Sequence, residues 1–175
     1  MARSALGPQG ARLNKGPRAG AEYIPAATVI AGSLMSLLPI ISSGGWWPDF
    51  GLLMLLGWRL LRADAWPAWW AAPLGFANDL ILGNPIGLSV ALWTAMMIAM
   101  DVLDRRTMWR DYWIEWAMAA LLIALSEIAH WRAAGILGAS VPFNISAGPS
   151  IVVAVLCFPV AGYIASRLDR WRLGR

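Results

Sequence analysis

The chain has 175 residues, of which 59% are hydrophobic and only 14% are charged. Soluble domains usually carry about 25% charged residues, so this chain has too few to coat a water-facing surface. Its mean hydropathy of +0.58 and its 12 tryptophans indicate an integral protein that crosses the lipid bilayer several times, because Trp collects at membrane–water interfaces. The net charge of +4 comes from basic residues that flank apolar segments, which argues against nucleic acid as a partner.

The two ends of the chain are polar and basic. Residues 1–22 are rich in Gly and Pro and lack the apolar periodicity of a helix, so we expect a disordered cytoplasmic tail. Residues 170–175 are expected to form a second, short basic tail, with the membrane domain at residues 23–169 between them. The first apolar run has no small-residue cleavage site and is interpreted as an uncleaved span.

Six apolar segments predict an all-α integral membrane protein, a bundle of six transmembrane helices. The second is short, at about 22 Å against a hydrocarbon core of ~30 Å, so neighbouring helices must shield it or the bilayer must thin around it. Pro159 predicts a kink in the sixth. The expected spans are residues 25–41, 47–61, 66–82, 86–103, 112–137 and 150–168.

The basic residues give these spans an orientation. With a cytoplasmic N-terminus, all of the 14 Lys and Arg residues except Arg132 lie on the inner side. The positive-inside rule therefore predicts six spans with both termini in the cytoplasm. The alternative is a re-entrant hairpin made of the second and third spans, which would put Arg59 and Arg62 at membrane depth or outside.

Acidic residues near the membrane need a partner, a cavity or an interface, because an ionised group in hydrocarbon costs about 2.5–3.5 kcal/mol. Asp49 follows Pro48 and is expected to cap the start of the second span, with a contact to a neighbouring or partner helix as the alternative. Asp101 and Asp104 are expected to lie in water at an inner helix end.

The segment GFANDLILGNPIGL at residues 75–88 places Asp79 inside the third span. Gly75 and Gly83 lie one helical turn before and after it, and small residues at this spacing let another helix approach closely. We expect Asp79 to bind backbone or hydroxyl groups of a neighbouring helix; lining a polar cavity and proton or ion chemistry are the alternatives. Pro85 and Gly87 fix the outer turn that follows, and Gly87 also predicts close packing at the start of the fourth span.

Glu127 and His130 share a face of the fifth span and predict a polar pair in the outer half of the membrane. A Glu-x-x-His pair binds metal in a bundle only with matching pairs on other helices, and this chain has one histidine, so we expect no metal. Motifs for phosphate binding, serine hydrolysis and zinc proteolysis are also missing from the sequence. We therefore expect no cofactor and no enzymatic activity.

The tripeptide PDF at residues 48–50 and the pattern Gly-x-x-x-Asp-x-x-x-Gly-x-Pro-x-Gly at residues 75–87 resemble the bacterial rod-shape-determining MreD family. The motifs lie within residues 47–103, and size and span number extend the likeness to about residues 25–168. The resemblance implies a non-enzymatic scaffold of the cell-elongation machinery in the bacterial cytoplasmic (inner) membrane, where lateral peptidoglycan is made. Its implied partners are a single-span MreC-like protein, MreB filaments, RodA and a penicillin-binding protein. The expected helix-packing and partner-contact residues are Asp49, Gly75, Asp79, Gly83, Pro85 and Gly87.

The resemblance also implies a similarity to the substrate-binding subunits of vitamin transporters, which gives an alternative function: a membrane subunit that binds a small molecule for transport. The residues that could line an outer cavity would be Asp49, Asp79, Glu127, His130 and Trp131. Sparse polar residues and the lack of matching broken helices in the two halves count against this alternative. The sequence leaves open whether the chain forms homo-oligomers and what the loop at residues 138–149 does.

Overall fold

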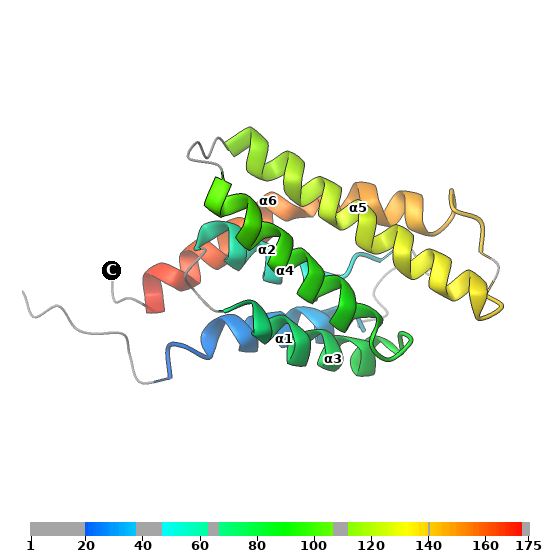
Figure 1. Ribbon diagram of the computed structural model, residues 1–175, viewed down its shortest axis with the longest axis horizontal. Coiled ribbons are helices and arrows are strands. Elements are labelled where there is room, and N and C mark those ends of the chain that lie inside the picture. The colour runs from blue at the N-terminus through cyan, green and yellow to red at the C-terminus, as the bar shows by residue number, and fades with distance from the viewer. Residues whose placement is uncertain (1–19, 38–46, 63–66, 107–111, 140, 173–175) are drawn as a thin grey trace, which may run out of the picture.

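The computed structural model describes residues 20–37, 47–62, 67–106, 112–139 and 141–172, and these residues are helical, with no strand among them (Figure 1). The all-α prediction is therefore confirmed. The elements are α1 (Ile24–Met35), α2 (Phe50–Leu61), the 3₁₀ helix η1 (Ala68–Trp70), α3 (Ala71–Leu82), α4 (Leu88–Arg106), α5 (Tyr112–Ile136) and α6 (Ala147–Arg172).

Each of the six predicted segments overlaps one α-helix, with the largest differences at the two ends of the chain. The predicted tail at residues 1–22 lies mostly outside the described residues, and α1 is described only as far as its C-cap region near residue 37. At the other end, α6 continues through residues 170–172, so the first residues of the predicted basic tail are helical. The extension is held by an ion pair between Asp169 and Arg172, one turn apart on α6.

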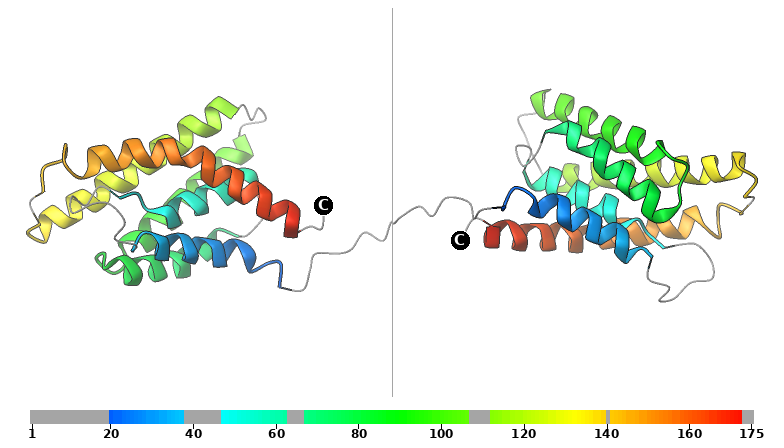
Figure 2. Two further views of the ribbon diagram at one scale, coloured as in Figure 1. Left: turned by 180° about the vertical axis from the view of Figure 1, so that it is seen from behind. Right: turned by 90° about the horizontal axis from the view of Figure 1, so that it is seen from below.

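Helix α2 is the centre of the bundle. Every residue from Gly51 to Leu60 is buried, although the helix has only 12 residues. It lies between α1 and α6, while α3 and α4 form a hairpin that packs on α1 (Figures 1 and 2). The buried side chains of Trp93 and Met97 on α4 add to the core. An apolar helix that is buried on all sides, as α2 is, belongs to the core of a helical bundle.

Glycines set the closest helix contacts. A Cβ on Gly32 of α1 would lie 2.7 Å from the Phe50 carbonyl oxygen of α2. A Cβ on Gly75 of α3 would lie 2.8 Å from the Ser89 backbone of α4. Because neither position has a side chain, the helix backbones come into direct contact. In lipid, where burial of apolar side chains does not drive helices together, such close packing at small residues holds them together.

Two helices in the described part of the chain are long and apolar enough to cross a membrane: α5, over Trp113–Ile136, and α6, over Ala147–Arg172. Their large apolar side chains are largely exposed, among them Leu121, Leu125, Val152 and Leu156. Apolar surface of this extent indicates an environment of lipid. Helices α1 and α2 are apolar but shorter. Helix α6 is continuous and contains Pro159, and Figure 2 shows it bent near its middle, in line with the predicted kink.

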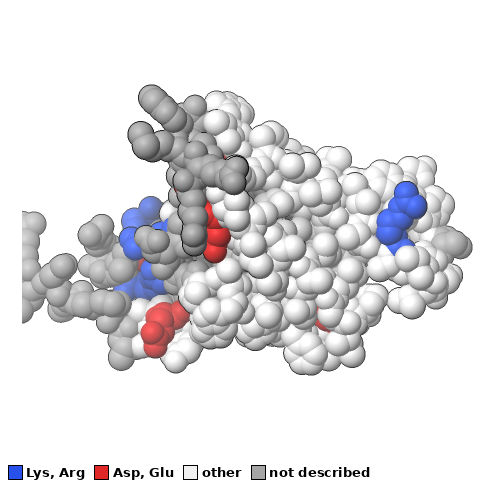
Figure 3. Space-filling model, in the orientation of Figure 1, with Lys and Arg blue, Asp and Glu red and all other residues white. Residues whose placement is uncertain are grey.

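Charged side chains gather at one end of the molecule. In Figure 3 the visible face is uncharged over its broad middle, with basic and acidic atoms close together at the end where α2 and α6 finish. On this face an apolar waist separates the charged end from an isolated basic patch at the opposite end. The waist is the part expected in hydrocarbon.

Candidate functional site

Asp79 lies near the end of α3 and caps the next helix. Its Oδ2 accepts a hydrogen bond from the Gly87 N–H at 2.8 Å, and its two carboxylate oxygens lie 3.0 and 3.2 Å from the Ser89 nitrogen. Helix α4 begins at Leu88, so Gly87 directly precedes it and Ser89 lies in its first turn, where the N–H groups have no intrahelical acceptor. The buried negative charge also complements the positive end of α4. Asp79 therefore joins the two helices of the hairpin.

The glycines around Asp79 have two different roles. Gly75 is the point at which α3 touches α4. Gly83 has φ +69° and ends α3 in the left-handed conformation, and Gly87 has φ +96° before α4. A Cβ on Gly83 or Gly87 would meet no atom within 4 Å. Of the three glycines expected to pack, the described chain uses only Gly75 in this way, because α3 ends before Gly83 and the helical spacing no longer applies.

Pro85 lies in the turn between these helices, and its carbonyl accepts a hydrogen bond from the Leu88 N–H at 3.0 Å. The Asn84 N–H binds the Asp79 carbonyl, also at 3.0 Å. The turn is therefore closed by backbone hydrogen bonds on both sides of the proline.

Asp49 connects α2 with the hairpin. Its Oδ1 accepts a hydrogen bond from the Leu52 N–H at 3.1 Å, which makes Asp49 the N-cap of α2, as its place after Pro48 predicts. Its Oδ2 accepts a hydrogen bond from the Asn78 side-chain amide at 2.8 Å. The same amide lies 3.3 Å from the Ser89 hydroxyl. Three helices thus meet at the fully buried Asn78 side chain.

His130 extends this network to α5. Its Nδ1 lies 2.8 Å from the Ser126 carbonyl oxygen, and its Nε2 lies 3.2 Å from the Ser89 hydroxyl. A carbonyl can only accept, so we assign the proton of the neutral ring to Nδ1. Nε2 then accepts from Ser89, whose oxygen accepts from Asn78. The hydrogen bonds run continuously from α5 to the start of α2.

Glu127 faces the same region but has other partners than His130. Its carboxyl group lies within hydrogen-bonding reach of the Ser150 hydroxyl and of the Asp49 backbone. The two members of the polar pair predicted on this face of α5 thus have separate sets of contacts. We call the group formed by these side chains the outer polar cluster, after the side of the membrane that the sequence predicts for it: Asp49, Asn78, Asp79, Ser89, Glu127 and His130.

A small cavity of about 150 Å³ opens beside the outer polar cluster. Asp79 and Trp131 are not part of its lining, in contrast to the expectation for an outer cavity. Trp131 instead donates a hydrogen bond to the Val141 carbonyl at 2.8 Å and holds the loop before α6. No cluster suited to a metal ion occurs among the described residues. The cavity is lined by Ser36, Trp47, Pro48, Asp49, Leu82, Asn84, Glu127 and His130.

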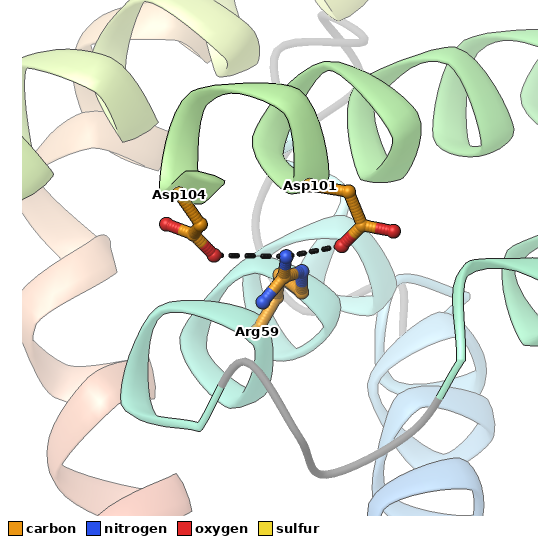
Figure 4. Close-up of polar contacts among 3 residues, drawn as sticks. All are labelled: Arg59, Asp101 and Asp104. Atoms are coloured by element: carbon orange, nitrogen blue, oxygen red, sulfur yellow. Dashed lines mark hydrogen bonds and ion pairs between the residues drawn. The ribbon is translucent and has the colours of Figure 1, made fainter. Parts of the chain in front are cut away.

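A second cluster lies at the other end of α2. The Arg59 guanidinium is buried and forms ion pairs with Asp101 and, at 2.9 Å, with Asp104 (Figure 4). Both aspartates come from the last turns of α4, and their spacing of three places them on one helix face. As expected for a helix end, each aspartate keeps part of its surface exposed, but both also bind Arg59, which the sequence did not predict.

Helix α6 joins the same end of α2. Arg62 Nε lies 3.0 Å from Asp169 Oδ2, and Arg172 lies 3.0 Å from Asp169 Oδ1. The Arg172 guanidinium also stacks over the Trp58 ring at 5.6 Å. We call this group the inner ionic cluster, after the side of the membrane that the sequence predicts for it. Its three arginines and three aspartates balance in charge: Arg59, Arg62, Arg172, Asp101, Asp104 and Asp169.

The sequence singled out all three acidic members of the outer polar cluster, and His130, but not Asn78 and Ser89, which link them. The signal for Asn78 was its place beside Asp79, within the same apolar helix. No protein-family model, curated protein or solved structure matches this chain. Its function therefore has to be inferred from the two clusters and from the resemblance carried by residues 47–103.

Proposed function

We propose that this chain is a multi-pass scaffold of the bacterial cytoplasmic membrane, of the MreD type, within the machinery that elongates rod-shaped cells. One observation carries the proposal. Asp79, the acidic residue of the family-like motif, has its carboxylate bound by backbone N–H groups of α4. A carboxylate bound in this way fixes the position of α3 relative to α4. A surface that packs against a partner helix needs such a fixed arrangement. The partners would be an MreC-like single-span protein and, through it, MreB, RodA and a penicillin-binding protein.

The proposed topology has six spans and cytoplasmic termini. The outer polar cluster and the inner ionic cluster lie at the two ends of α2, whose 12 residues span about 18 Å. This length is shorter than the ~30 Å hydrocarbon core, so the bilayer would thin around the bundle or partner helices would cover its ends. The arginines near the end of α2 agree with a cytoplasmic location of that end.

The cavity volume favours the scaffold over a transport subunit. Small-molecule sites usually enclose about 300–1,000 Å³. The cavity beside Asp49, Glu127 and His130 has about 150 Å³, enough for a few water molecules, each of which occupies about 30 Å³ in the liquid. The outer polar cluster is therefore better suited to joining helices than to enclosing a vitamin-sized ligand.

Depletion of the protein in its own cells tests the proposal. We expect rod-shaped cells to become round as the protein is lost, because the machinery that makes the lateral wall would no longer stay assembled. Re-expression of the wild-type chain should restore rods, and the Ile86→Ala variant, altered at an exposed turn residue, should restore them equally. Unchanged cell shape together with a new nutrient requirement would contradict the scaffold and favour the transport subunit.

Assembly gives a second readout. We expect Asp79→Leu to reduce co-purification with an MreC-like partner several-fold while the Ile86→Ala control keeps the wild-type yield. The variant must first run as a single species in detergent, so that loss of the complex is separated from loss of the fold. Wild-type yield with Asp79→Leu would remove the α3–α4 hairpin from the interface.

A further inference from the structure

An apolar groove runs between α1 and α6, over the surface of α2. Its volume is about 360 Å³, within the usual range for a bound ligand. The lining is almost entirely hydrocarbon, so a ligand here must itself be apolar. We call it the α1–α6 groove; it is lined by Ala31, Met35, Leu53, Cys157, Val160 and Ile164, among others.

The groove side of α6 continues into a basic and aromatic end. Cys157, Val160 and Ile164 recur at intervals of three and four residues, so they form one stripe along the helix. The same spacing reaches Arg167 and then Trp171, and both side chains are exposed. The apolar groove is therefore followed, along one face of α6, by a cation and an interfacial ring.

Some arginines at this end of the bundle form ion pairs and others do not. Arg59, Arg62 and Arg172 are each bound by a carboxylate of the inner ionic cluster. Arg167 and Arg170 are exposed and have no ion-pair partner among the described residues. Two free guanidinium groups beside an apolar groove match a molecule with an anionic head and a hydrocarbon chain.

We propose that the α1–α6 groove holds an acyl chain of an anionic phospholipid of the cytoplasmic leaflet, whose phosphate binds Arg167 and Arg170. The inference rests on the proposed topology, which places this end of the bundle at the cytoplasmic surface, where anionic lipids are found. A membrane helix of a partner protein would also cover the groove, but the apolar surface of such a helix would offer no anion to Arg167 and Arg170. The lipid accounts for the groove and the arginines together.

Headgroup selectivity is the first test. The purified full chain, stripped of lipid in detergent, is titrated with fluorescent phosphatidylglycerol and with phosphatidylcholine carrying the same chains. We expect tighter binding of phosphatidylglycerol, and we expect the double variant Arg167→Ala/Arg170→Ala to lose about tenfold in that affinity. Arg132→Ala removes an exposed arginine at the far end of α5 and should leave binding unchanged. Equal affinity for the two lipids, or an unaffected double variant, would overturn the proposal.

Chain occupancy is the second test. Ala31→Phe places a ring in the groove, whereas Ala27→Phe adds the same ring to an exposed position of α1 outside its lining. We expect Ala31→Phe alone to weaken phosphatidylglycerol binding several-fold, with thermal melting of the lipid-free proteins equal for both variants. Displacement of the lipid by millimolar inorganic phosphate would mean that only an anion site exists, and would overturn the role of the groove.

If a partner helix and not a lipid occupies the groove, the two measurements give the opposite results. If Ala31→Phe abolished co-purification with an MreC-like protein while lipid binding stayed at the wild-type level, the groove would be a helix-docking site and the lipid proposal would be wrong. Lipid titration needs only the isolated chain. Its failure therefore leaves the scaffold proposal standing, and failure of the depletion experiment leaves the lipid measurement interpretable.

Discussion

The outer polar cluster and the inner ionic cluster lie at opposite ends of α2, and they bind their carboxylates with different groups. At the outer end, Asp79 is bound by backbone N–H groups of α4, and Asp49 by a backbone N–H and an amide. At the inner end, aspartates of α4 and α6 are bound by arginine side chains of α2. The outer polar cluster binds its carboxylates largely with backbone N–H groups, which a substitution does not remove. The inner ionic cluster binds them with arginine side chains, each of which a single substitution removes.

The largest effect is expected from Arg59→Met. The substitution keeps the apolar stem but leaves Asp101 and Asp104 without their cation, and breaking a buried pair costs about 3–5 kcal/mol. Because the Asp101 side chain is 39% exposed, we expect the lower end of that range, about 3 kcal/mol, in the free energy of unfolding in detergent.

Arg62→Met is the matched control, since the same substitution is made three residues later, at the C-cap of α2. The Arg62 side chain is 42% exposed, so its loss should cost less than about 1 kcal/mol. If the two variants unfolded at the same denaturant concentration, the buried position of Arg59 would have no special importance for stability.

A smaller effect is expected at the outer end. Asp79→Leu leaves the N–H groups of Gly87 and Ser89 without an acceptor, which should lower the free energy of unfolding by about 2–3 kcal/mol. Asp79→Asn keeps one carbonyl oxygen and should lose only about 1 kcal/mol. Equal losses for the two variants would show that the charge, and not the acceptor geometry, stabilises the hairpin.

The smallest effects separate the glycines of the motif. Gly75→Ala brings a methyl group to within 2.8 Å of the Ser89 backbone and should cost about 1–2 kcal/mol. Gly83→Ala should cost about 1 kcal/mol for another reason, its left-handed φ of +69°. Because Asn tolerates that conformation, Gly83→Asn should recover most of the stability in thermal melting. A comparable recovery with Gly75→Asn would contradict the contact between α3 and α4.

Helix positions could be predicted well from the sequence, because apolar runs and turn residues are local signals. The segments ended within a few residues of the observed helices wherever Pro or Gly marked the boundary, as at Pro48 and Gly83. The N-cap role of Asp49 was also readable, since it depends only on its place before the helix. These features need no knowledge of how the helices pack.

Contacts between helices could not be predicted in the same way. Arg59 meets Asp101 and Asp104 because of how α2 and α4 are rotated against each other, and a single sequence contains no signal for that rotation. The link from Asn78 to Asp49 spans 29 positions and depends on the same packing. Gly83 was misassigned because its spacing from Asp79 was read as helical, although α3 ends at that point.

The cap that Asp79 places on α4 also has a consequence for biosynthesis. Its N–H donors lie only 8 and 10 residues further along the chain, whereas Arg62 and Asp169 are 107 residues apart. The carboxylate can thus be bound as soon as the next helix starts to wind, while the ribosome is still adding later segments. Helices α3 and α4 would then leave the insertion machinery already packed together. Arg62 would stay in contact with water until α6 is inserted and brings Asp169 beside it.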